Sequence, residues 1–300
     1  MQPIEFPPNL HVRTNISLAD YNNIHIGGPA DYLITVRDQN IFIELYHFCK
    51  QRHLRFLPLG DGTNVFFPET GYRGLIALIR FDRMSLAAGN TLVTEAGVSL
   101  AQISEFCIEN RLTGLEFLTG IPGTIGGAVF GNAGAYGDNV GNHLVRAKIM
   151  DENGAIRFVD ASYFQFRYRH SFLKEKNAWV LQAEFQLEKG ERSAIRDTCQ
   201  SIKAKRTEKL PPPETRTAGS WFKNIKDEYG NATAAAKFLD AVGSKQTHVR
   251  DAAVHPKHAN IFYNKGDATA QDMLELERIL QKRVQEKFGI KLQREVMYLN

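Results

Sequence analysis

Glycine-rich segments are the first residues of this sequence to suggest chemistry. Residues 114–137 hold eight glycines in 24 positions, where the chain average of 24 in 300 predicts about two. Glycine permits positive φ angles and close approach of a ligand, and successive backbone N–H groups can then hold a phosphate. A second turn, Gly60–Asn64 (GDGTN), follows an apolar segment. Two glycine loops could hold the two phosphates of one dinucleotide, and a tightly turned packing loop explains the glycine count equally well.

Other catalytic and ligand motifs do not occur in the sequence. Neither glycine segment is GxGxxG or GxxxxGK[ST], which disfavours a Rossmann fold and a P-loop NTPase. Without GxSxG, a serine hydrolase is not expected. Cys49, Cys107 and Cys199 form no CxxC pair, and His255 and His258 do not have helical metal-ligand spacing. We therefore predict no metal site.

The composition is that of a globular protein. Hydrophobic residues make up 43% and charged residues 23%, and 37 basic against 33 acidic residues leave a net charge of +4. This balance indicates neither a nucleic-acid nor a membrane partner. Phe117–Gly137 carries no charge, but its seven glycines and Pro122 are unlike a lipid-facing helix, so we interpret it as buried, irregular backbone. Met1–Pro8 does not resemble a signal peptide, and the sequence predicts a soluble, cytoplasmic protein.

Strands and helices must hold these loops in place. Helices are predicted at Asn40–Gln51 and Ser99–Asn110. Apolar runs predict strands at Asp31–Val36, Leu54–Leu59, Gly74–Arg80, Thr91–Ala96, Leu144–Met150, Ile156–Asp160 and Trp179–Leu187. Near residue 190 the composition becomes polar, and a helix-compatible connector at 191–206 ends at Leu210–Pro213.

The remaining residues, 214–300, predict a second unit with one clear helix. Apolar spacing places that helix at 270–288, with Thr269 as its N-cap and Gly289 at its C-terminal end. Ile290–Leu299 then predicts a strand.

Six segments and the glycine block together resemble one family. The block at 114–137 resembles the signature of the MurB family, the UDP-N-acetylenolpyruvoylglucosamine reductases of peptidoglycan synthesis. The other segments agree in chain order: Ile26–Asp31 (IGGPAD), Leu59–Asn64 (LGDGTN), Phe166–Ser171 (FRYRHS), Ala218–Asn224 (AGSWFKN), His258–Asn260 (HAN) and Lys287–Val296 (KFGIKLQREV).

The resemblance implies an α+β fold with two domains. A FAD-binding domain of the vanillyl-alcohol-oxidase (PCMH) type is expected at residues 1–195, with its core at about 21–190, and a smaller α+β substrate-binding domain at 196–300. The implied activity is reduction of UDP-N-acetylglucosamine enolpyruvate to UDP-N-acetylmuramate, with NADPH as reductant and non-covalent FAD as cofactor, in cell wall biosynthesis. The connection from 179–187 to 191–206 has no long insertion, which resembles the shorter form of the family without a tyrosine loop. A monomer or weak oligomer with a UDP-sugar and NADPH as partners is expected.

The resemblance also assigns catalytic roles to three residues. In such a reduction, hydride reaches the enolpyruvyl carbon and negative charge grows toward the attached carboxylate, so a cation and a proton-sharing acid are needed there. Arg169 suits the cation and Glu295 the acid, while Ser220 suits delivery of the proton. Without the motifs, Arg169 would be a surface arginine, Glu295 an exposed strand carboxylate and Ser220 part of a turn.

The same carry-over names the binding residues. Tyr168, Lys209 and Asn224 are candidates for the substrate, although Lys209 fits a solvated basic run equally well. The candidates for the cofactor are Gly60, Gly62, Thr63, Asn64, Gly120, Pro122, Gly123, Thr124, Gly126, Gly127, Asn132 and Ala133.

The sequence departs from the family pattern at several places. Asp61 stands where glycine is usual, and a carboxylate beside a pyrophosphate repels it unless the carboxylate points away or meets a cation. Trp221 is bulkier than the usual residue after the serine, and Asn22–His25, Ala234–Ala236 and His248–Arg250 also differ. These departures keep two alternatives open: a non-catalytic paralogue that binds a nucleotide sugar, and a sugar oxidase on the same flavin fold.

Overall fold

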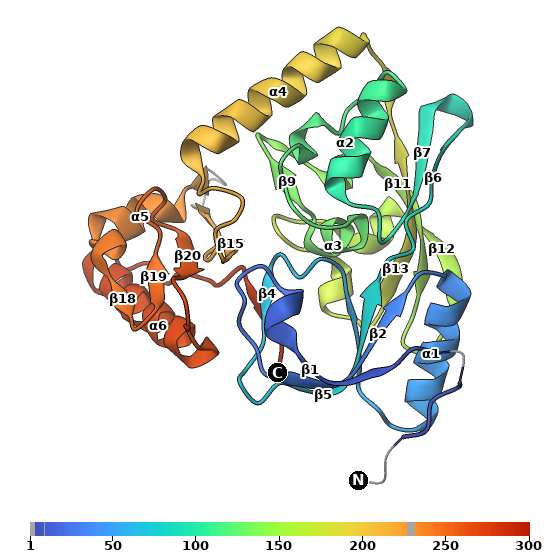
Figure 1. Cartoon of the computed structure of the whole chain (residues 1–300). Coiled ribbons are helices and arrows are strands. Elements are labelled where there is room, and N and C mark those ends of the chain that lie inside the picture. Colours follow the sequence, from blue (N-terminus) through green and yellow to red (C-terminus); the bar gives the residue numbers. More distant parts are fainter. Residues whose placement is uncertain (1–3, 9, 227–231) are drawn as a thin grey trace. The chain divides into compact units, whose positions relative to one another are not determined.

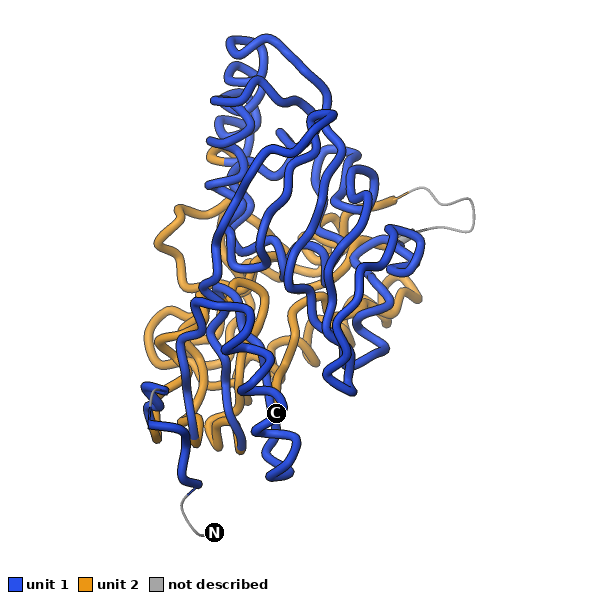
Figure 2. The backbone as a smooth tube through the Cα atoms, turned by 90° about the vertical axis from the view of Figure 1, so that its right-hand side faces the viewer, with its two compact units in different colours: residues 1–13, 32–61, 74–206 blue, residues 14–31, 62–73, 207–300 orange. Residues whose placement is uncertain are grey.

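The computed structural model describes residues 4–8, 10–226 and 232–300 (Figure 1). The chain forms two compact units, coloured separately in Figure 2. Unit 1 contains residues 1–13, 32–61 and 74–206, and unit 2 contains residues 14–31, 62–73 and 207–300. The chain therefore passes between the units several times, and segments 14–31 and 62–73 group with the C-terminal part. Each unit has its own hydrophobic core.

A five-stranded antiparallel sheet organises unit 1. Its order is β12-β11-β13-β7-β6, and the strands are β6 (Met84–Ala87), β7 (Thr91–Glu95), β11 (Leu144–Met150), β12 (Ile156–Asp160) and β13 (Trp179–Gln186). The central strand, β13, is mostly buried, as expected for a strand covered on both faces, and Trp179, Gln182 and Gln186 are its less buried residues. Helix α3 (Ile125–Gly131) packs against β13 and β7.

A second sheet leads to the first glycine turn. Its order is β1-β2-β5-β3, and the strands are β1 (Arg13–Ser17), β2 (Pro29–Val36), β3 (Phe56–Leu59) and β5 (Tyr72–Ile79). Strands β2 and β5 begin in unit 2 and continue into unit 1. Helix α1 (Gln39–Gln51) starts at Asp38, whose side chain accepts hydrogen bonds from the next turn, and β3 runs parallel to β5 into Gly60.

The glycine block contains a short helix that the sequence did not predict. Helix α2 (Leu100–Glu109), with a capping box at Ser99, precedes the block, and α3 lies within it. A Cβ at Gly126 would lie 3.0 Å from the Ala96 Cβ and 3.2 Å from the Ala96 carbonyl oxygen, so glycine lets α3 pack tightly against Ala96. The prediction of wholly irregular backbone at 117–137 is therefore wrong, because tertiary packing forms a helix from residues of poor helix propensity. Among the described residues, no helix is long and apolar enough to cross a membrane.

Unit 2 pairs a small antiparallel sheet with a long helix. The sheet order is β15-β20-β19-β18, with β15 (Thr217–Ser220), β18 (His248–Val249), β19 (Ala252–Val254) and β20 (Ile261–Asn264). Helix α6 (Ala270–Phe288) has Thr269 at its N-cap and Gly289 in the left-handed region at its end, as predicted. Helix α5 (Ala235–Ala241) packs against α6.

The predicted strand Ile290–Leu299 forms only in part. Its residues are extended, but the strand is β21 (Met297–Tyr298), which pairs in parallel with β4 (Val65–Phe66). Before it, Arg294 forms a bridge with Phe222. The segment changes partners along its length, which prevents one continuous ladder.

The polar connector is the helix α4 (Arg192–Lys209), and the two units change over at residue 206 within it. The remaining short strands are β8 (Leu112–Thr113), β9 (Gly134–Ala135), β10 (Asp138–Asn139), β14 (Glu188–Lys189), β16 (Ile225–Lys226) and β17 (Ala232–Thr233). The 3-10 turns are Leu18–Tyr21, Ala88–Asn90, Glu116–Leu118, Val140–Asn142, Ala161–Phe164, Phe172–Lys174 and Ser244–Gln246.

Candidate active site

Ser220 lies at the end of an irregular strand in unit 2. The β15–β20 register shifts between Thr217 and Ser220, and Gly219 between them has φ +83°. The Thr217 Oγ1 accepts a hydrogen bond from the Gly219 N–H at 3.2 Å and donates one to the Phe262 carbonyl at 2.7 Å. The bulge turns the Ser220 side chain to the exposed face, while the following Trp221 is buried. The hydroxyl is thus accessible to a ligand.

Glu295 lies beside Ser220 because the two segments are hydrogen-bonded neighbours. The Glu295 N–H donates to the Trp221 carbonyl at 2.8 Å, and the Lys223 N–H donates to the Gln293 carbonyl at 2.9 Å. Glu295 is half-buried. A hydroxyl and a carboxyl that the sequence separates by 75 positions therefore lie on hydrogen-bonded neighbouring segments of unit 2.

Asn64, at the end of the first glycine turn, contacts the segment that carries Glu295. Its Nδ2 donates to the Glu295 carbonyl at 3.5 Å, and the Met297 N–H donates to its carbonyl at 3.0 Å. In the same turn, Gly62 (φ +65°) lies against the Tyr21 carbonyl, where a Cβ would collide with the backbone. The loop predicted to hold the cofactor phosphates is therefore built from close backbone contacts that require glycine.

Arg169 occupies a strained turn in unit 1. The Arg167 and His170 backbones form reciprocal hydrogen bonds of 3.1 and 3.0 Å, and Arg169 between them has φ +53°. The Arg169 Nη1 donates to the Gly134 carbonyl at 2.8 Å, and its guanidinium lies 5.4 Å from the centre of the Tyr168 ring. The glycine block thus orients the predicted catalytic arginine.

A second guanidinium lies on the glycine block, and the sequence analysis did not single it out. The Arg206 Nε donates to the Gly120 carbonyl at 3.0 Å. Burial lowers the pKa of Arg206, Tyr136 opposes that shift through a hydrogen bond, and the nearby Arg169 adds to it. Two guanidinium groups close enough to interact in this way favour an anion between them. The sequence signal for Arg206 was its place in the loose basic run with Lys203, Lys205 and Lys209.

Asp61 has a cation beside it. The Arg80 Nη2 lies 3.5 Å from the Asp61 Oδ1, and the Arg80 Nη1 donates to the Gly60 carbonyl at 3.2 Å. A carboxylate at this position would repel a pyrophosphate unless it points away or meets a cation. Arg80 is such a cation, and its charge offsets that of Asp61.

The two glycine segments meet within unit 1. A Cβ at Gly60 would lie 2.6 Å from the Thr124 Oγ1, so the first turn approaches the start of α3 closely. Gly120, Pro122 and Gly127 are exposed around this contact. Asn132 differs, because its side chain is buried and bonded on both sides, accepting from the Gly141 N–H at 3.0 Å and donating to the Arg167 carbonyl at 3.0 Å. Asn132 therefore also connects the glycine block to the Arg169 turn. Among the other predicted cofactor residues, Thr63, Gly123, Gly126 and Ala133 are half-buried.

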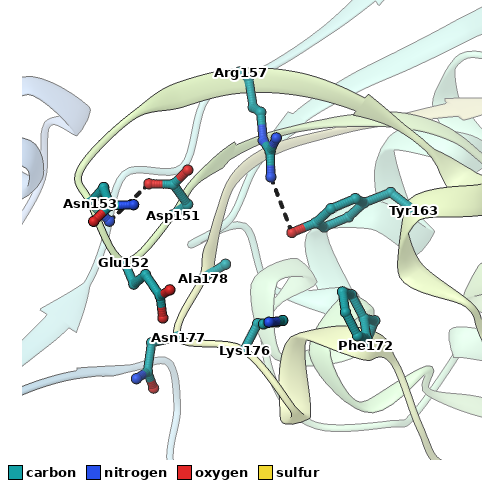
Figure 3. A pocket seen from close by; sticks show the side chains of 9 residues that line it. All are labelled: Asp151, Glu152, Asn153, Arg157, Tyr163, Phe172, Lys176, Asn177 and Ala178. Atoms are coloured by element: carbon teal, nitrogen blue, oxygen red, sulfur yellow. Dashed lines mark hydrogen bonds between the residues drawn. The ribbon is translucent and has the colours of Figure 1, made fainter.

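Asn224 and Lys209 are surface residues of unit 2. The Asn224 Oδ1 accepts from the Ala235 N–H at 3.3 Å at the start of α5, and Asn224 and Lys209 are both exposed, whereas Tyr168 of unit 1 is half-buried. Separately, Figure 3 shows a polar hollow of unit 1 between Asp151, Arg157, Tyr163 and Lys176. None of the predicted site residues lines it, so we assign it no role in the site.

The sequence matches family models over both parts of the chain. Residues 30–160 match the FAD binding domain, and residues 211–299 match the UDP-N-acetylenolpyruvoylglucosamine reductase C-terminal domain. The UDP-N-acetylenolpyruvoylglucosamine reductase of Clostridium novyi is 35% identical over 287 residues, which are 95% of this chain and 91% of that protein. The chain belongs to the MurB family of UDP-N-acetylenolpyruvoylglucosamine reductases. It is accordingly an oxidoreductase with an FAD-binding domain.

Other MurB relatives agree over the same length. The reductase of Caldanaerobacter subterraneus is 36% identical over 282 residues, covering 94% of this chain and 91% of that one. The crystal structure of the MurB reductase from Thermus caldophilus superposes with a TM-score of 0.81 at 27% identity, covering 97% of this chain and all of the other. The predicted α+β fold with a PCMH-type FAD domain is confirmed.

The predicted residues distribute unevenly over the matched ranges. Ser220, Asn224 and Glu295 fall within the C-terminal match, and all the predicted cofactor residues fall within the FAD match. Tyr168, Arg169 and Lys209 lie between the two matches. Their assignment depends on the local motifs and on the geometry described above.

Proposed function

We propose that this chain reduces UDP-N-acetylglucosamine enolpyruvate to UDP-N-acetylmuramate with NADPH, in peptidoglycan synthesis. The observation that carries the proposal is the hydrogen-bonded pairing of the Ser220 and Glu295 segments in unit 2. FAD, when bound, would accept hydride from NADPH and deliver it to the enolpyruvyl carbon. The chain's own residues must then bind the carboxylate, stabilise the charge on it and deliver a proton.

Arg169 binds the substrate carboxylate in this proposal. Its guanidinium is permanently charged and matches a carboxylate with two parallel hydrogen bonds. The bond to the Gly134 carbonyl and the turn at Arg167–His170 hold it in one orientation. A cation already in place costs no reorganisation when negative charge develops.

Ser220 and Glu295 handle the proton. Glu295 shares a proton with the developing carboxylate charge, and Ser220 delivers a proton to the neighbouring carbon. The hydrogen bonds between the two backbone segments support this division of roles, because side chains on neighbouring segments can reach the same substrate group.

The binding residues complete the proposal. Tyr168, Lys209 and Asn224 hold the substrate, with Lys209 as a point charge for the UDP pyrophosphate. FAD is held by residues of the two glycine segments, and the Asp61–Arg80 pair makes the first segment compatible with its pyrophosphate. The domain division into a FAD part at 1–195 and a substrate part at 196–300, the absence of a metal, and a cytoplasmic monomer or weak oligomer remain predictions.

A two-step anaerobic titration tests the proposal. The FAD-loaded protein is mixed with NADPH and then with the enolpyruvyl substrate, while the visible flavin absorbance is followed. Bleaching by NADPH followed by recovery with substrate is the expected result. Binding of the UDP-sugar without recovery would support the non-catalytic paralogue, and recovery with oxygen alone would support the sugar oxidase.

A further inference from the structure

One carboxylate on α6 contacts both segments of the proposed acid–base pair. The Trp221 Nε1 donates to the Glu277 Oε2 at 3.0 Å, and the Arg294 Nη1 lies 3.5 Å from the same oxygen. Trp221 directly follows Ser220, and Arg294 directly precedes Glu295. Glu277 therefore contacts the sequence neighbour of each of the two residues proposed to move the proton.

The other carboxylate oxygen of Glu277 accepts a hydrogen bond from Gln281, which also binds the C-terminal segment. The Gln281 Nε2 donates to the Glu277 Oε1 at 3.3 Å and to the Leu292 carbonyl at 3.1 Å. Gln281 lies one turn further along α6. The helix therefore contacts the C-terminal segment at the Arg294 side chain, through Glu277, and at the Leu292 backbone, through Gln281.

The backbone ladder between the two segments is short. Two hydrogen bonds, Glu295 to Trp221 and Lys223 to Gln293, join them around the bridge of Phe222 and Arg294. A slip of one residue in an extended segment turns each side chain to the opposite face. Here such a slip would exchange Glu295 with Arg294 or Val296 on the site face. The segments therefore need a contact that distinguishes one register from the next.

The Glu277 contact has the properties of a register device. The Trp221 indole is fully buried and stacks on Phe262 at 4.7 Å between ring centres, and the Glu277 side chain is 11% exposed. Burial raises the pKa of Glu277, while Arg294 and the Trp221 hydrogen bond oppose that shift. A buried ionic group adds little net stability compared with apolar packing, and its best-attested benefit is structural specificity.

We propose that Glu277 is a positioning residue, which sets the offset between the Ser220 and Glu295 segments by binding Trp221 and Arg294 with one carboxylate. This inference rests on the proposed function of that pair. Because Trp221 directly follows Ser220 and Arg294 directly precedes Glu295, anchoring both at one carboxylate fixes the backbone from which Ser220 and Glu295 project. Acid–base steps are sensitive to such alignment, since a displacement of about 1 Å can reduce a rate by about 100-fold.

Three variants test the positioning role. Glu277→Gln keeps an acceptor for Trp221 but removes the charge that pairs with Arg294. The triple replacement Trp221→Phe, Glu277→Met and Arg294→Met removes the whole polar contact without leaving a buried charge unpaired, and it is chosen for that reason to preserve folding. Glu286→Gln is the matched control, because Glu286 lies on the same helix and is exposed, paired only loosely with Lys282 at 3.8 Å.

Stopped-flow measurement of the two flavin half-reactions gives the main readout. We expect the triple variant to lose about tenfold or more in the limiting rate of reoxidation by substrate, with flavin reduction by NADPH and substrate Kd changed by about twofold at most. Glu277→Gln falls between the triple variant and the wild type, and Glu286→Gln matches the wild type. Equal losses in both half-reactions, or reoxidation within about twofold of the wild type in both Glu277 variants, would overturn the proposal.

Hydrogen exchange supplies a readout that does not need turnover. The Glu295 N–H, which donates to Trp221, is expected to exchange faster in the Glu277 variants at unchanged unfolding free energy. Unchanged exchange at Glu295 would overturn the positioning role. If the wild-type flavin is not reoxidised by substrate, the proposed function fails, and this exchange measurement still decides about Glu277. If the triple variant does not fold, Glu277→Gln decides by the same two criteria.

Discussion

Arg80 is the residue that balances the charge of Asp61 in the proposed phosphate loop, Gly60–Asn64. It pairs with Asp61 at 3.5 Å, and the two side chains are 33% and 35% exposed, so solvent screens part of their interaction. Without Arg80, the carboxylate would face the cofactor pyrophosphate uncompensated. We predict that Arg80→Ala weakens FAD binding by about three- to tenfold, and more at low salt, where screening is weaker. Fluorescence titration with FAD measures this change.

A second substitution in the same loop isolates the cause. Asp61→Gly removes the charge that Arg80 neutralises, so the double variant Arg80→Ala/Asp61→Gly should bind FAD about as tightly as the wild type. Arg83→Ala, an exposed arginine outside the loop, serves as the control. If the double variant binds as weakly as Arg80→Ala alone, charge compensation is not the role of Arg80.

Ser220 allows a sharper test of chemistry, because its exposed side chain contributes little to packing. Ser220→Ala should leave NADPH reduction of the flavin intact and slow reoxidation by substrate by about 100- to 10,000-fold, the range of a lost general acid. Ser85→Ala, on the exposed strand β6, should change neither step. Equal slowing of both half-reactions by Ser220→Ala would rule out the proton-donor role.

At the scale of single elements, α6 is held by its N-terminal cap. The Thr269 Oγ1 accepts from the Asp272 N–H at 3.1 Å, and the Asp272 Oδ2 accepts from the Thr269 N–H at 3.0 Å. We predict that Thr269→Ala lowers the free energy of unfolding by about 1 kcal/mol, measured by urea denaturation. Thr198→Ala, in the exposed middle of α4, is the control and should be neutral or slightly stabilising. A cost at Thr198 equal to that at Thr269 would argue against a specific capping effect.

The same scale shows what the sequence could predict. Helices with strong local signals, such as α1 and α6, were predicted almost to the residue, because caps and apolar periodicity act locally. Helix α3 was missed because it depends on Gly126 fitting against Ala96, a contact between distant residues. The Ile290–Leu299 strand was only partly right because its pairing partners, Phe222 and Val65, are far away in the sequence.

The site shows the same division between local and distant information. Short motifs identified Ser220 and Glu295, but no local pattern indicated that Glu277 would contact Trp221 and Arg294, the residues next to them. The contacts of Arg80 and Arg206 could not be predicted either, because each side chain binds a residue more than ten positions away. Partners of this kind become visible only when the chain has folded.

At the scale of the whole molecule, the order of the chain determines which pieces can fold alone. The core of unit 2 includes Ile24, Ile26 and Phe66, all of them buried, although the C-terminal family match begins at residue 211. Strand β4 pairs with β21, and the Asn264 Nδ2 donates to the Ile24 carbonyl at 3.2 Å. A fragment of residues 196–300 would lack these partners and expose the faces that they cover.

We therefore predict that the fragment 196–300 does not fold by itself. Burial of each missing apolar side chain is worth about 1.5–3 kcal/mol, and three of them together match much of a domain's net stability of about 5–15 kcal/mol. Circular dichroism and amide NMR dispersion of the purified fragment measure this, and co-expression with residues 1–195 should restore a cooperative transition. A cooperative unfolding transition in the isolated fragment would show that segments 14–31 and 62–73 are dispensable, and the predicted division at residue 195 would then describe an independent domain.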